Sequence, residues 1–107
     1  MNILKNLFEA HGFKLIGTAA NGQIAIDKFN SLPTKPDVVL MDYRMPNKNG
    51  IEATVEILKS GYPSKIIFAT SDVYIKEQAL KVGATSVINK PFNFDELINK
   101  INDVLKK

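Results

Sequence analysis

A short apolar run that ends in an acidic residue constrains the fold of this chain most strongly. The run is Val-Val-Leu-Met at 38–41, and Asp42 closes it. It is short, β-branched at its start and followed by turn-forming residues, so it predicts a buried strand. In open α/β sheets, the carboxyl ends of such strands are where ligands bind, which makes Asp42 a candidate functional residue. The alternative is that Asp42 only caps the loop that follows.

Apolar runs of the same kind recur along the chain and alternate with segments of helical periodicity. Strands alternating with helices are typical of a parallel sheet with right-handed crossovers, so the fold class is predicted to be α/β. Because the sequence shows no linker or internal repeat, residues 1–107 are expected to form a single domain. Further strands are predicted at 14–20, 65–70 and 86–89, and helices at 1–11, about 22–30, 50–60, about 73–82 and from 93 onward.

Helical spacing also predicts which side chains of these helices face the core. Asn21, Ser71, Asp72 and Asn93 are suited to cap the helices that follow them, with Ser71 and Asp72 both candidates for the same helix, and Glu96 completes a capping-box spacing with Asn93. The expected inward residues are Ile3, Leu4, Leu7 and Phe8, then Ile24, Ala25 and Phe29, then Ile51, Val55 and Leu58, and finally Leu97, Ile98, Ile101, Val104 and Leu105.

The composition excludes several classes of protein. The 14 basic and 11 acidic residues give a net charge of only +3, and the lysines are scattered, so nucleic-acid binding is not expected. The absence of cysteine excludes disulfides, zinc thiolate sites and thiol catalysis, and fits a reducing compartment. No apolar run is long enough to span a bilayer, and no signal-peptide pattern is present. We therefore expect a cytoplasmic protein that binds neither nucleic acid nor membranes.

Three polar residues fall at the carboxyl ends of three predicted strands. They are Asp42, Thr70 and Lys90, and in a parallel sheet these ends lie along one edge. A carboxylate can attack a phosphoryl group as a nucleophile, while a hydroxyl and an ammonium can hold the transferred oxygens. The alternatives are that Thr70 is an ordinary strand residue and Lys90 an ordinary surface lysine. The bond between Lys90 and Pro91 is also a candidate for the cis isomer.

The sequence resembles the receiver domains of two-component response regulators, and most closely the chemotaxis-type, single-domain members. The resemblance covers essentially the whole chain. It implies a flavodoxin-like parallel sheet with flanking helices and strand order 2-1-3-4-5. The residues that carry it are Asp-Val-Val-Leu-Met-Asp-Tyr-Arg-Met-Pro at 37–46 with Gly50, Phe-Ala-Thr-Ser at 68–71, Gly-Ala-Thr at 83–85 and Lys-Pro-Phe at 90–92.

The resemblance assigns roles to the candidate residues. It implies that Asp42 is the phosphoacceptor, that Thr70 is the switch hydroxyl, and that Lys90 is the invariant lysine before a cis Pro91. It also implies that Asp42 and the backbone carbonyl of Arg44 are magnesium ligands. The expected phosphodonor is a sensor histidine kinase or phosphotransfer protein. The output is expected to pass to a downstream protein through the face formed by residues 71–92, so the chain is expected to signal rather than to act as an enzyme.

The sequence departs from the family pattern at its start. The family's first strand is central in the sheet and ends in two adjacent acids that hold Mg²⁺, whereas here only Glu9, Asp27 and Asp37 precede Asp42, and none adjoins another acid. Met1 aligns inside the family's first helix, so the first strand is expected to be missing. The sheet is then expected to rearrange or to exchange strands with another chain as a homodimer, and Mg²⁺ binding is expected to be weak or absent.

The sequence also departs from the family pattern in its last predicted strand. Val87 stands where the family usually has an aromatic ring that moves with the switch hydroxyl, and Ser86 replaces a common glycine.

The main alternative to a phosphorylated receiver is a pseudo-receiver, an interaction or oligomerisation module that is not phosphorylated because the acid pair is absent. An aspartate-nucleophile phosphatase needs a second acid where this chain has Arg44. A nucleotide-binding enzyme is less favoured still, because neither of the common glycine-rich phosphate-binding motifs occurs.

Overall fold

Helices and strands alternate through the described part of the chain. The computed structural model describes residues 3–13, 22–42 and 49–106. The strand predicted at 14–20 and the cap predicted at Asn21 lie outside these residues. The elements, in chain order, are α1 (Ile3–Ala10), α2 (Gly22–Ser31), β1 (Val38–Asp42), α3 (Gly50–Lys59), β2 (Lys65–Ala69), α4 (Val73–Lys81), β3 (Ser86–Ile88) and α5 (Phe94–Leu105).

The three described strands form a parallel sheet in the order β1-β2-β3. Asp42 pairs in register with Ala69, and Ala69 pairs in turn with Ile88. The carboxyl ends of the strands therefore lie along one edge of the sheet. The predicted parallel sheet with flanking helices is confirmed. The prediction that the run at 38–41 is a buried strand was wrong in part, because only Met41 is buried, Val38 and Val39 are half-buried and Leu40 is 44% exposed. Exchange of strands with another chain stays a prediction, because the structure contains a single chain.

β2 is the most deeply buried strand, and its alternating side chains supply both faces of the sheet. Ile66 and Phe68 point to one face, while Ile67 and Ala69 point to the other, and each is at most 2% exposed. A parallel strand that is covered on both faces reads as a continuous apolar run. This burial explains why Lys-Ile-Ile-Phe-Ala at 65–69 lacks the alternation of polar and apolar residues typical of a half-exposed strand.

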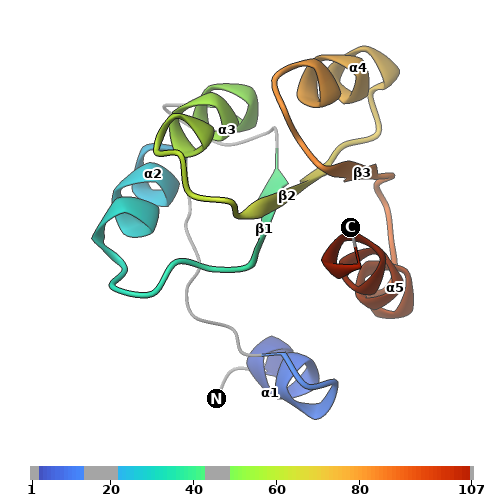
Figure 1. The fold of residues 1–107 in the computed structure, drawn as a ribbon. Coiled ribbons are helices and arrows are strands. Elements are labelled where there is room, and N and C mark those ends of the chain that lie inside the picture. Colours follow the sequence, from blue (N-terminus) through green and yellow to red (C-terminus); the bar gives the residue numbers. More distant parts are fainter. Residues whose placement is uncertain (1–2, 14–21, 43–48, 107) are drawn as a thin grey trace.

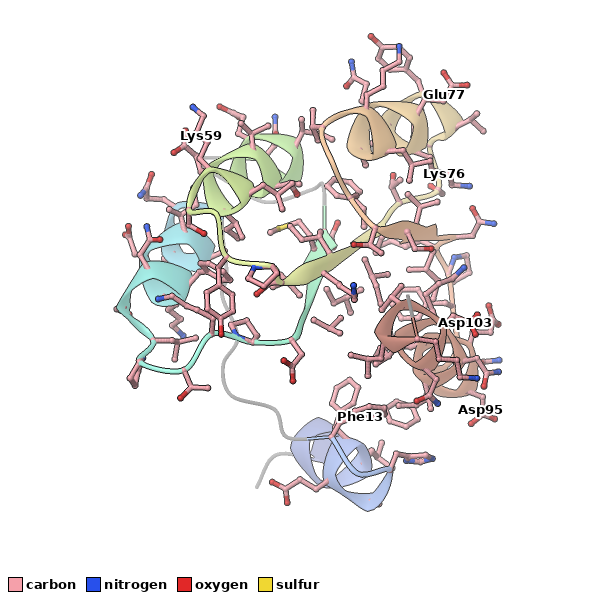
Figure 2. The ribbon with its side chains drawn as sticks, in the orientation of Figure 1. Phe13, Lys59, Lys76, Glu77, Asp95 and Asp103 are labelled. Carbon is pink, nitrogen blue, oxygen red and sulfur yellow. The ribbon has the colours of Figure 1, made fainter. Side chains whose placement is uncertain are left out.

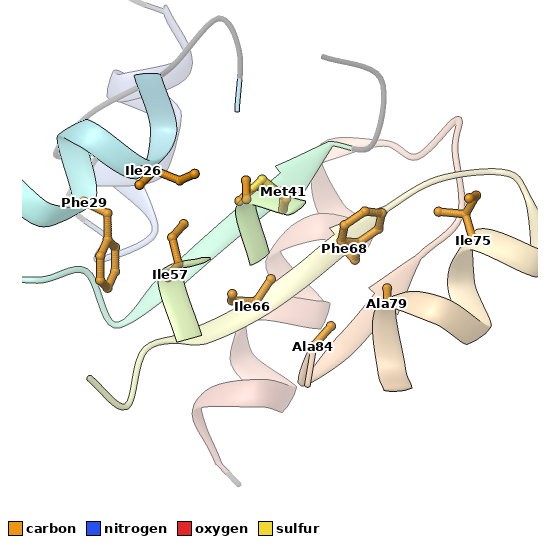
Figure 3. Close-up of a cluster of buried hydrophobic side chains, with 10 residues drawn as sticks. Ile26, Phe29, Met41, Ile57, Ile66, Phe68, Ile75, Ala79 and Ala84 are labelled. Carbon is orange, nitrogen blue, oxygen red and sulfur yellow. The ribbon is translucent and has the colours of Figure 1, made fainter. Parts of the chain in front are cut away.

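Helices cover both faces of the sheet. In Figure 1, α2, α3 and α4 lie on one side of the strands, and α1 and α5 lie on the other. The first core cluster joins the sheet to α2, α3 and α4 (Figure 3), and comprises Ile26, Phe29, Met41, Ala53, Ile57, Ile66, Phe68, Ile75, Ala79 and Ala84. The second cluster joins the sheet to α1 and α5, and comprises Phe8, Ile67, Ala69, Ile88, Leu97, Ile98, Ile101 and Val104.

Phe13 is a half-buried aromatic residue next to α1. Phe13 points from the end of α1 toward the sheet (Figure 2) and packs against the second cluster. The charged side chains of Lys59, Glu77, Asp95 and Asp103 lie on the outer faces of their helices in the same view. The helices therefore have the apolar inner face and charged outer face expected of a domain in water.

Side-chain caps begin three of the helices. Asp72 accepts hydrogen bonds from the N–H groups of Tyr74 and Ile75 at the start of α4. Asn93 accepts one from Glu96 at the start of α5, so the caps predicted at Asp72 and Asn93 are confirmed. Asn49 and Glu52 form a reciprocal capping box at the start of α3. These caps satisfy N–H groups that have no partner within the helix.

The predicted inward faces of α1, α2 and α5 were wrong at one residue each. In α1, Leu7 is 42% exposed, whereas its neighbour Phe8 is buried. In α2, Ile24 is 37% exposed, and the buried large side chains are Ile26 and Phe29. Ile26 and Phe29 lie three residues apart and share one helix face, while Ile24 lies on another. In α5, Leu105 at the last turn is 42% exposed, because Val104 already faces the core at the neighbouring position.

In α3 the prediction was right only in part, because Ile51 and Leu58 pack against the first core cluster while other residues are more deeply buried. Ile51, Val55 and Leu58 are only half-buried, whereas Ala53, Thr54 and Ile57 are buried. Two of these three buried side chains, those of Ala53 and Thr54, are small, and the third, that of Ile57, is large. The prediction chose the large apolar residues of the helix. We infer that it failed because the positions nearest the core carry Ala53 and Thr54, whose short side chains let α3 approach its neighbours closely.

Thr54 gives a stability prediction. Its side chain is fully buried, and among the described residues its Oγ1 has no hydrogen-bond partner. An unpaired buried hydroxyl costs about 1–3 kcal/mol, so Thr54→Val is expected to raise the free energy of unfolding by about 1 kcal/mol. Thr54→Ser keeps the hydroxyl and loses a methyl group, so it is expected to lower that free energy by a similar amount. Urea unfolding measures both. A less stable valine variant would contradict the absence of a partner.

Candidate functional site

One small pocket lies at the carboxyl edge of the sheet. It has a volume of about 140 Å³ and is lined by Asp42, Thr70, Ser71 and Lys90. Asp42 ends β1, Thr70 directly follows β2, and Lys90 comes two residues after β3. The convergence expected of Asp42, Thr70 and Lys90 is therefore observed, and Ser71 is an addition. The chemical roles of these residues stay predictions.

Asp42 and Lys90 form an ion pair in this pocket. The ammonium Nζ of Lys90 donates to Oδ2 of Asp42, across 48 positions of sequence. The side chains are 37% exposed for Lys90 and 42% exposed for Asp42, so both groups remain in contact with water. A pair this exposed contributes little to stability. Its position does, however, hold a carboxylate oxygen and a cation side by side at an accessible point.

Thr70 ties the ends of β2 and β3 together. Its backbone N–H donates to the carbonyl oxygen of Ile88 at 3.2 Å, and its own carbonyl accepts from the N–H of Lys90 at 3.4 Å. The residue is 7% exposed. The side-chain Oγ1 accepts from the N–H of Asp72 at 3.2 Å. That bond uses a lone pair of Oγ1 and leaves the hydroxyl hydrogen for another acceptor.

The peptide bond between Lys90 and Pro91 is cis, as the resemblance to receiver domains implied. The backbone of Lys90 is fixed on the sheet side by its bond to Thr70. On the other side, Asn93 caps α5 three residues later. Lys90 is therefore held between the end of the sheet and the start of a helix. Its ammonium group can reach Asp42 because its own backbone is anchored beside Thr70.

Gly50 brings the start of α3 against the end of β1. A Cβ atom built at Gly50 would lie 2.3 Å from the carbonyl oxygen of Asp42 and 3.0 Å from Cζ of Phe68. The distance to the Asp42 carbonyl oxygen is too short for any side chain, and the distance to Phe68 is tight. The sequence marks Gly50 only as a turn and motif residue, whereas the structure shows that its missing side chain lets α3 support the backbone of Asp42.

The described residues do not by themselves form a magnesium site. No group of three or more Asp, Glu or His side chains gathers in the described part of the chain, and the remaining positions contain none of these residue types. Asp42 is the one acidic residue that lines the pocket, and it is paired with Lys90. Mg²⁺ favours six oxygen ligands that usually include carboxylates. Arg44 lies outside the described residues, so its role as a ligand stays a prediction.

A larger pocket lies away from Asp42, between α4, β3 and α5. Its volume is about 400 Å³, and sequence reasoning did not identify it. Val87 is half-buried at this pocket and also packs against the first core cluster. The pocket is lined by Lys76, Val87, Ile88, Asn89, Glu96, Asn99, Lys100 and Asp103. Because its walls come from three separate elements, no single motif could have indicated it.

The comparisons with known proteins agree with this arrangement. The profile of the family described as "Response regulator receiver domain" matches residues 1–102. The chain belongs to this family. As a receiver domain it is a two-component signalling module of the chemotaxis-like type, and receiver domains in general are signalling modules rather than enzymes.

Relatives with curated names and solved structures support the assignment. Chemotaxis protein CheY of Thermotoga maritima is 38% identical, and the match covers 97% of this chain and 87% of CheY. CheY of Halobacterium salinarum is 36% identical over 97% of this chain and 86% of its own length. The response regulator domain of Thermotoga maritima CheB superposes with a TM-score of 0.82 at 33% identity, covering 97% of this receiver domain and 86% of that chain. The flavodoxin-like fold is thus confirmed.

Two further findings concern the metal and the membrane. Receiver domains typically bind Mg²⁺ at an acidic site. Among the helices that the structure describes, none combines the length and the apolar character that crossing a membrane requires.

Replacing Gly50 with alanine should disturb the site and the fold together. The new methyl group would overlap the Asp42 carbonyl and Phe68, so Gly50→Ala is expected to lower the free energy of unfolding by about 3 kcal/mol. Gly61→Ala is the matched control, because no atom lies within 4 Å of a Cβ there and only its positive φ of 78° is strained, at about 1 kcal/mol. Urea unfolding compares the two. If Gly50→Ala and Gly61→Ala lowered the free energy of unfolding equally, the result would contradict the role of Gly50 as a contact to Asp42.

The ion pair should matter little for stability. A double-mutant cycle of Asp42→Asn and Lys90→Met is expected to give a coupling energy below about 1 kcal/mol, because both groups are half exposed. The surface pair of Glu56 and Lys59, 3.6 Å apart, provides a reference cycle of similar size. A coupling of several kcal/mol at Asp42 would instead show that the pair is a structural element.

Proposed function

We propose that this receiver domain accepts a phosphoryl group on Asp42 from the phosphohistidine of a histidine kinase or a phosphotransfer protein. The observation that carries the proposal is the contact of the Asp42 carboxylate with the Lys90 ammonium in a pocket that also contains Thr70. The carboxylate is 42% exposed, so a donor can reach it from solvent. Family membership supports the same reaction class.

The transfer exchanges one phosphorus bond for another. A carboxylate oxygen of Asp42 attacks the phosphorus atom while the bond from phosphorus to the imidazole nitrogen breaks. The nitrogen keeps the electron pair of that bond, and Asp42 becomes an acyl phosphate. No oxidant or reductant is involved. The reaction requires a carboxylate that a donor can approach from solvent, and the 42% exposure of the Asp42 side chain supports this.

Lys90 and Thr70 are suited to stabilise the transferred group. The Lys90 ammonium already contacts the carboxylate, so it can move with the negative charge onto the phosphoryl oxygens. The hydroxyl hydrogen of Thr70 is not used by its bond to Asp72 and can be donated to one of those oxygens. A positive charge and a neutral donor then share the new charge on the phosphoryl group.

The contacts of Thr70 also provide a path from Asp42 to the surface. If Thr70 turns toward the phosphoryl group, its bond to the N–H of Asp72 weakens, and Asp72 caps α4. The first turn of α4 exposes Val73 and Tyr74, at 66% and 65%. These apolar side chains belong to the face formed by residues 71–92, through which we propose that a downstream protein binds.

The pseudo-receiver alternative is less well supported. A module kept only for its fold has no need to gather a carboxylate, an ammonium and a hydroxyl in one pocket, yet Asp42, Lys90 and Thr70 do gather. The feature in its favour, the lack of a second acid at the pocket, bears on the rate of phosphorylation and on the metal. It does not remove the acceptor itself.

Phosphorylation at Asp42 can be tested with a small phosphodonor and intact-mass measurement. The chain is expected to gain the mass of one phosphoryl group, and Asp42→Asn is expected to gain none. Lys90→Ala and Thr70→Val are expected to slow the gain by about tenfold or more, because each removes one stabilising group. Thr70→Ser keeps the hydroxyl and is the matched control, with a rate close to that of the original chain. Mass gained by the Asp42→Asn variant would refute the assignment.

A further inference from the structure

Of the described residues that line the pocket, only Ser71 has no part in the proposed transfer. The other three are Asp42, Thr70 and Lys90. Thr70 is 7% exposed, whereas Ser71 is an exposed residue at the solvent side of the pocket. Among the described residues, the Ser71 hydroxyl has no hydrogen-bond partner. A hydroxyl can both donate and accept, so this group is available to whatever enters the pocket.

The start of α4 explains why this hydroxyl is available. Ser71 and Asp72 are both of residue types that cap helices. In the structure the cap is Asp72, whose carboxylate accepts from the N–H groups of Tyr74 and Ile75 at 2.8 and 3.3 Å. The cap predicted at Ser71 was therefore wrong, because Asp72 already satisfies these two groups. The helix makes no use of the Ser71 hydroxyl, which lies at the pocket instead.

The backbone on both sides of Ser71 is held by hydrogen bonds. Before it, the N–H of Thr70 donates to the carbonyl of Ile88, and the carbonyl of Thr70 accepts from the N–H of Lys90. After it, the N–H of Asp72 donates to Oγ1 of Thr70 at 3.2 Å, which closes a turn around Ser71. A short side chain on a held backbone has little freedom to lose when it binds a ligand. Ser71 is therefore preorganised for a group in the pocket.

The donors of the pocket match the acceptors of a phosphoryl group. A phosphoryl group brings three acceptor oxygens. The pocket places three side-chain donors around Asp42, namely the ammonium of Lys90 and the hydroxyls of Thr70 and Ser71. Its volume of about 140 Å³ is several times the share of about 30 Å³ that one water molecule takes in the liquid, so a phosphoryl group fits. Lys90 and Thr70 account for two of the oxygens, and the third needs a further donor.

We propose that the Ser71 hydroxyl donates a hydrogen bond to the third oxygen of the phosphoryl group transferred to Asp42. No covalent bond to Ser71 forms or breaks. Negative charge on the phosphoryl oxygens is stabilised by a donor that is already in position, so the hydroxyl lowers the barrier to transfer. This role of Ser71 deepens the proposed function and rests on it, because that function supplies the phosphoryl group.

The first test compares the rates at which variants gain mass from phosphoramidate, a small phosphodonor. Ser71→Ala is expected to slow the gain by about tenfold, less than the loss of a donor in a closed site, because water competes at an exposed residue. Ser71→Thr keeps the hydroxyl and is expected to react within about twofold of the original chain. Ser31→Ala, which removes another exposed hydroxyl at the end of α2, is the matched control and is expected to react at the original rate.

Urea unfolding of the same variants distinguishes a chemical role from a structural one. Because the Ser71 hydroxyl has no partner among the described residues, Ser71→Ala is expected to unfold at the same urea concentration as the original chain. A slower transfer by a variant of unchanged stability assigns the effect to the pocket. A fall in the unfolding midpoint of Ser71→Ala that accounted for the slower transfer would overturn the proposed role.

The second test does not depend on phosphorylation. Asp42→Asn removes the negative charge that repels an anion, and inorganic phosphate then probes the donors of the pocket. An NMR titration of the backbone amides is expected to show saturable shifts at Thr70, Ser71 and Lys90. Adding Ser71→Ala to this variant is expected to weaken phosphate binding by about fivefold, the effect of one ordinary hydrogen bond. Adding Ser71→Thr instead is expected to preserve the affinity.

The results for Ser71 and for Asp42 can be told apart. Equal transfer rates with and without the Ser71 hydroxyl, equal phosphate affinities, or no phosphate binding would each overturn the role of Ser71. Mass gain by the original chain and none by Asp42→Asn would still support Asp42 as the phosphoacceptor. Conversely, phosphate binding that depends on the Ser71 hydroxyl, in a chain that gains no mass from a phosphodonor, would support the donor role of Ser71 and refute the proposed function.

Discussion

The parallel register of the three strands is the constraint on which the candidate site depends. Asp42, Ala69 and Ile88 lie side by side across the sheet, so the residues that follow each strand begin from the same edge. Thr70 then joins two of these ends through backbone hydrogen bonds on both its sides. A shift of β3 by one residue would move Lys90 away from Asp42 and place the wrong side chains toward each core. The apolar faces of β2 resist such a shift, so the packing of the core maintains the geometry of the pocket.

The sequence allowed the strands, the helix caps and the convergence of the polar residues to be predicted, because each depends on local rules. The run ending in Asp42, the caps at Asp72 and Asn93, and the polar residues at strand ends follow from turn chemistry and from parallel topology. Features that depend on how elements meet could not be predicted. The buried face of α3, with Thr54 at its centre, follows from the closeness of its neighbours. The exposure of Leu40 follows from the reach of α5, which no local pattern records.

The groups suited to chemistry in the pocket are largely separate from the residues that stabilise the fold. The ion pair of Asp42 and Lys90 is half exposed and contributes little to the folded state, whereas the residues that position it are buried. Substitutions at the two charged groups are therefore informative about reactivity, because they leave the scaffold intact. Family membership shows the signalling class of the chain, and Asp42 is the one acidic residue among the described residues that line the pocket.

The close approach of Gly50 to Asp42 makes the pocket unequal in stiffness on its two sides. On the side of α3, the Asp42 carbonyl rests against a helix start with no room for a methyl group, so the backbone there cannot yield. On the side of α4, Thr70 and Asp72 are joined by a single hydrogen bond of 3.2 Å near the surface. If Asp42 accepts a phosphoryl group as proposed, the α4 side of the pocket therefore has fewer steric contacts that oppose a rearrangement than the α3 side. The absence of a side chain at Gly50 would in that way favour one direction of movement over the other.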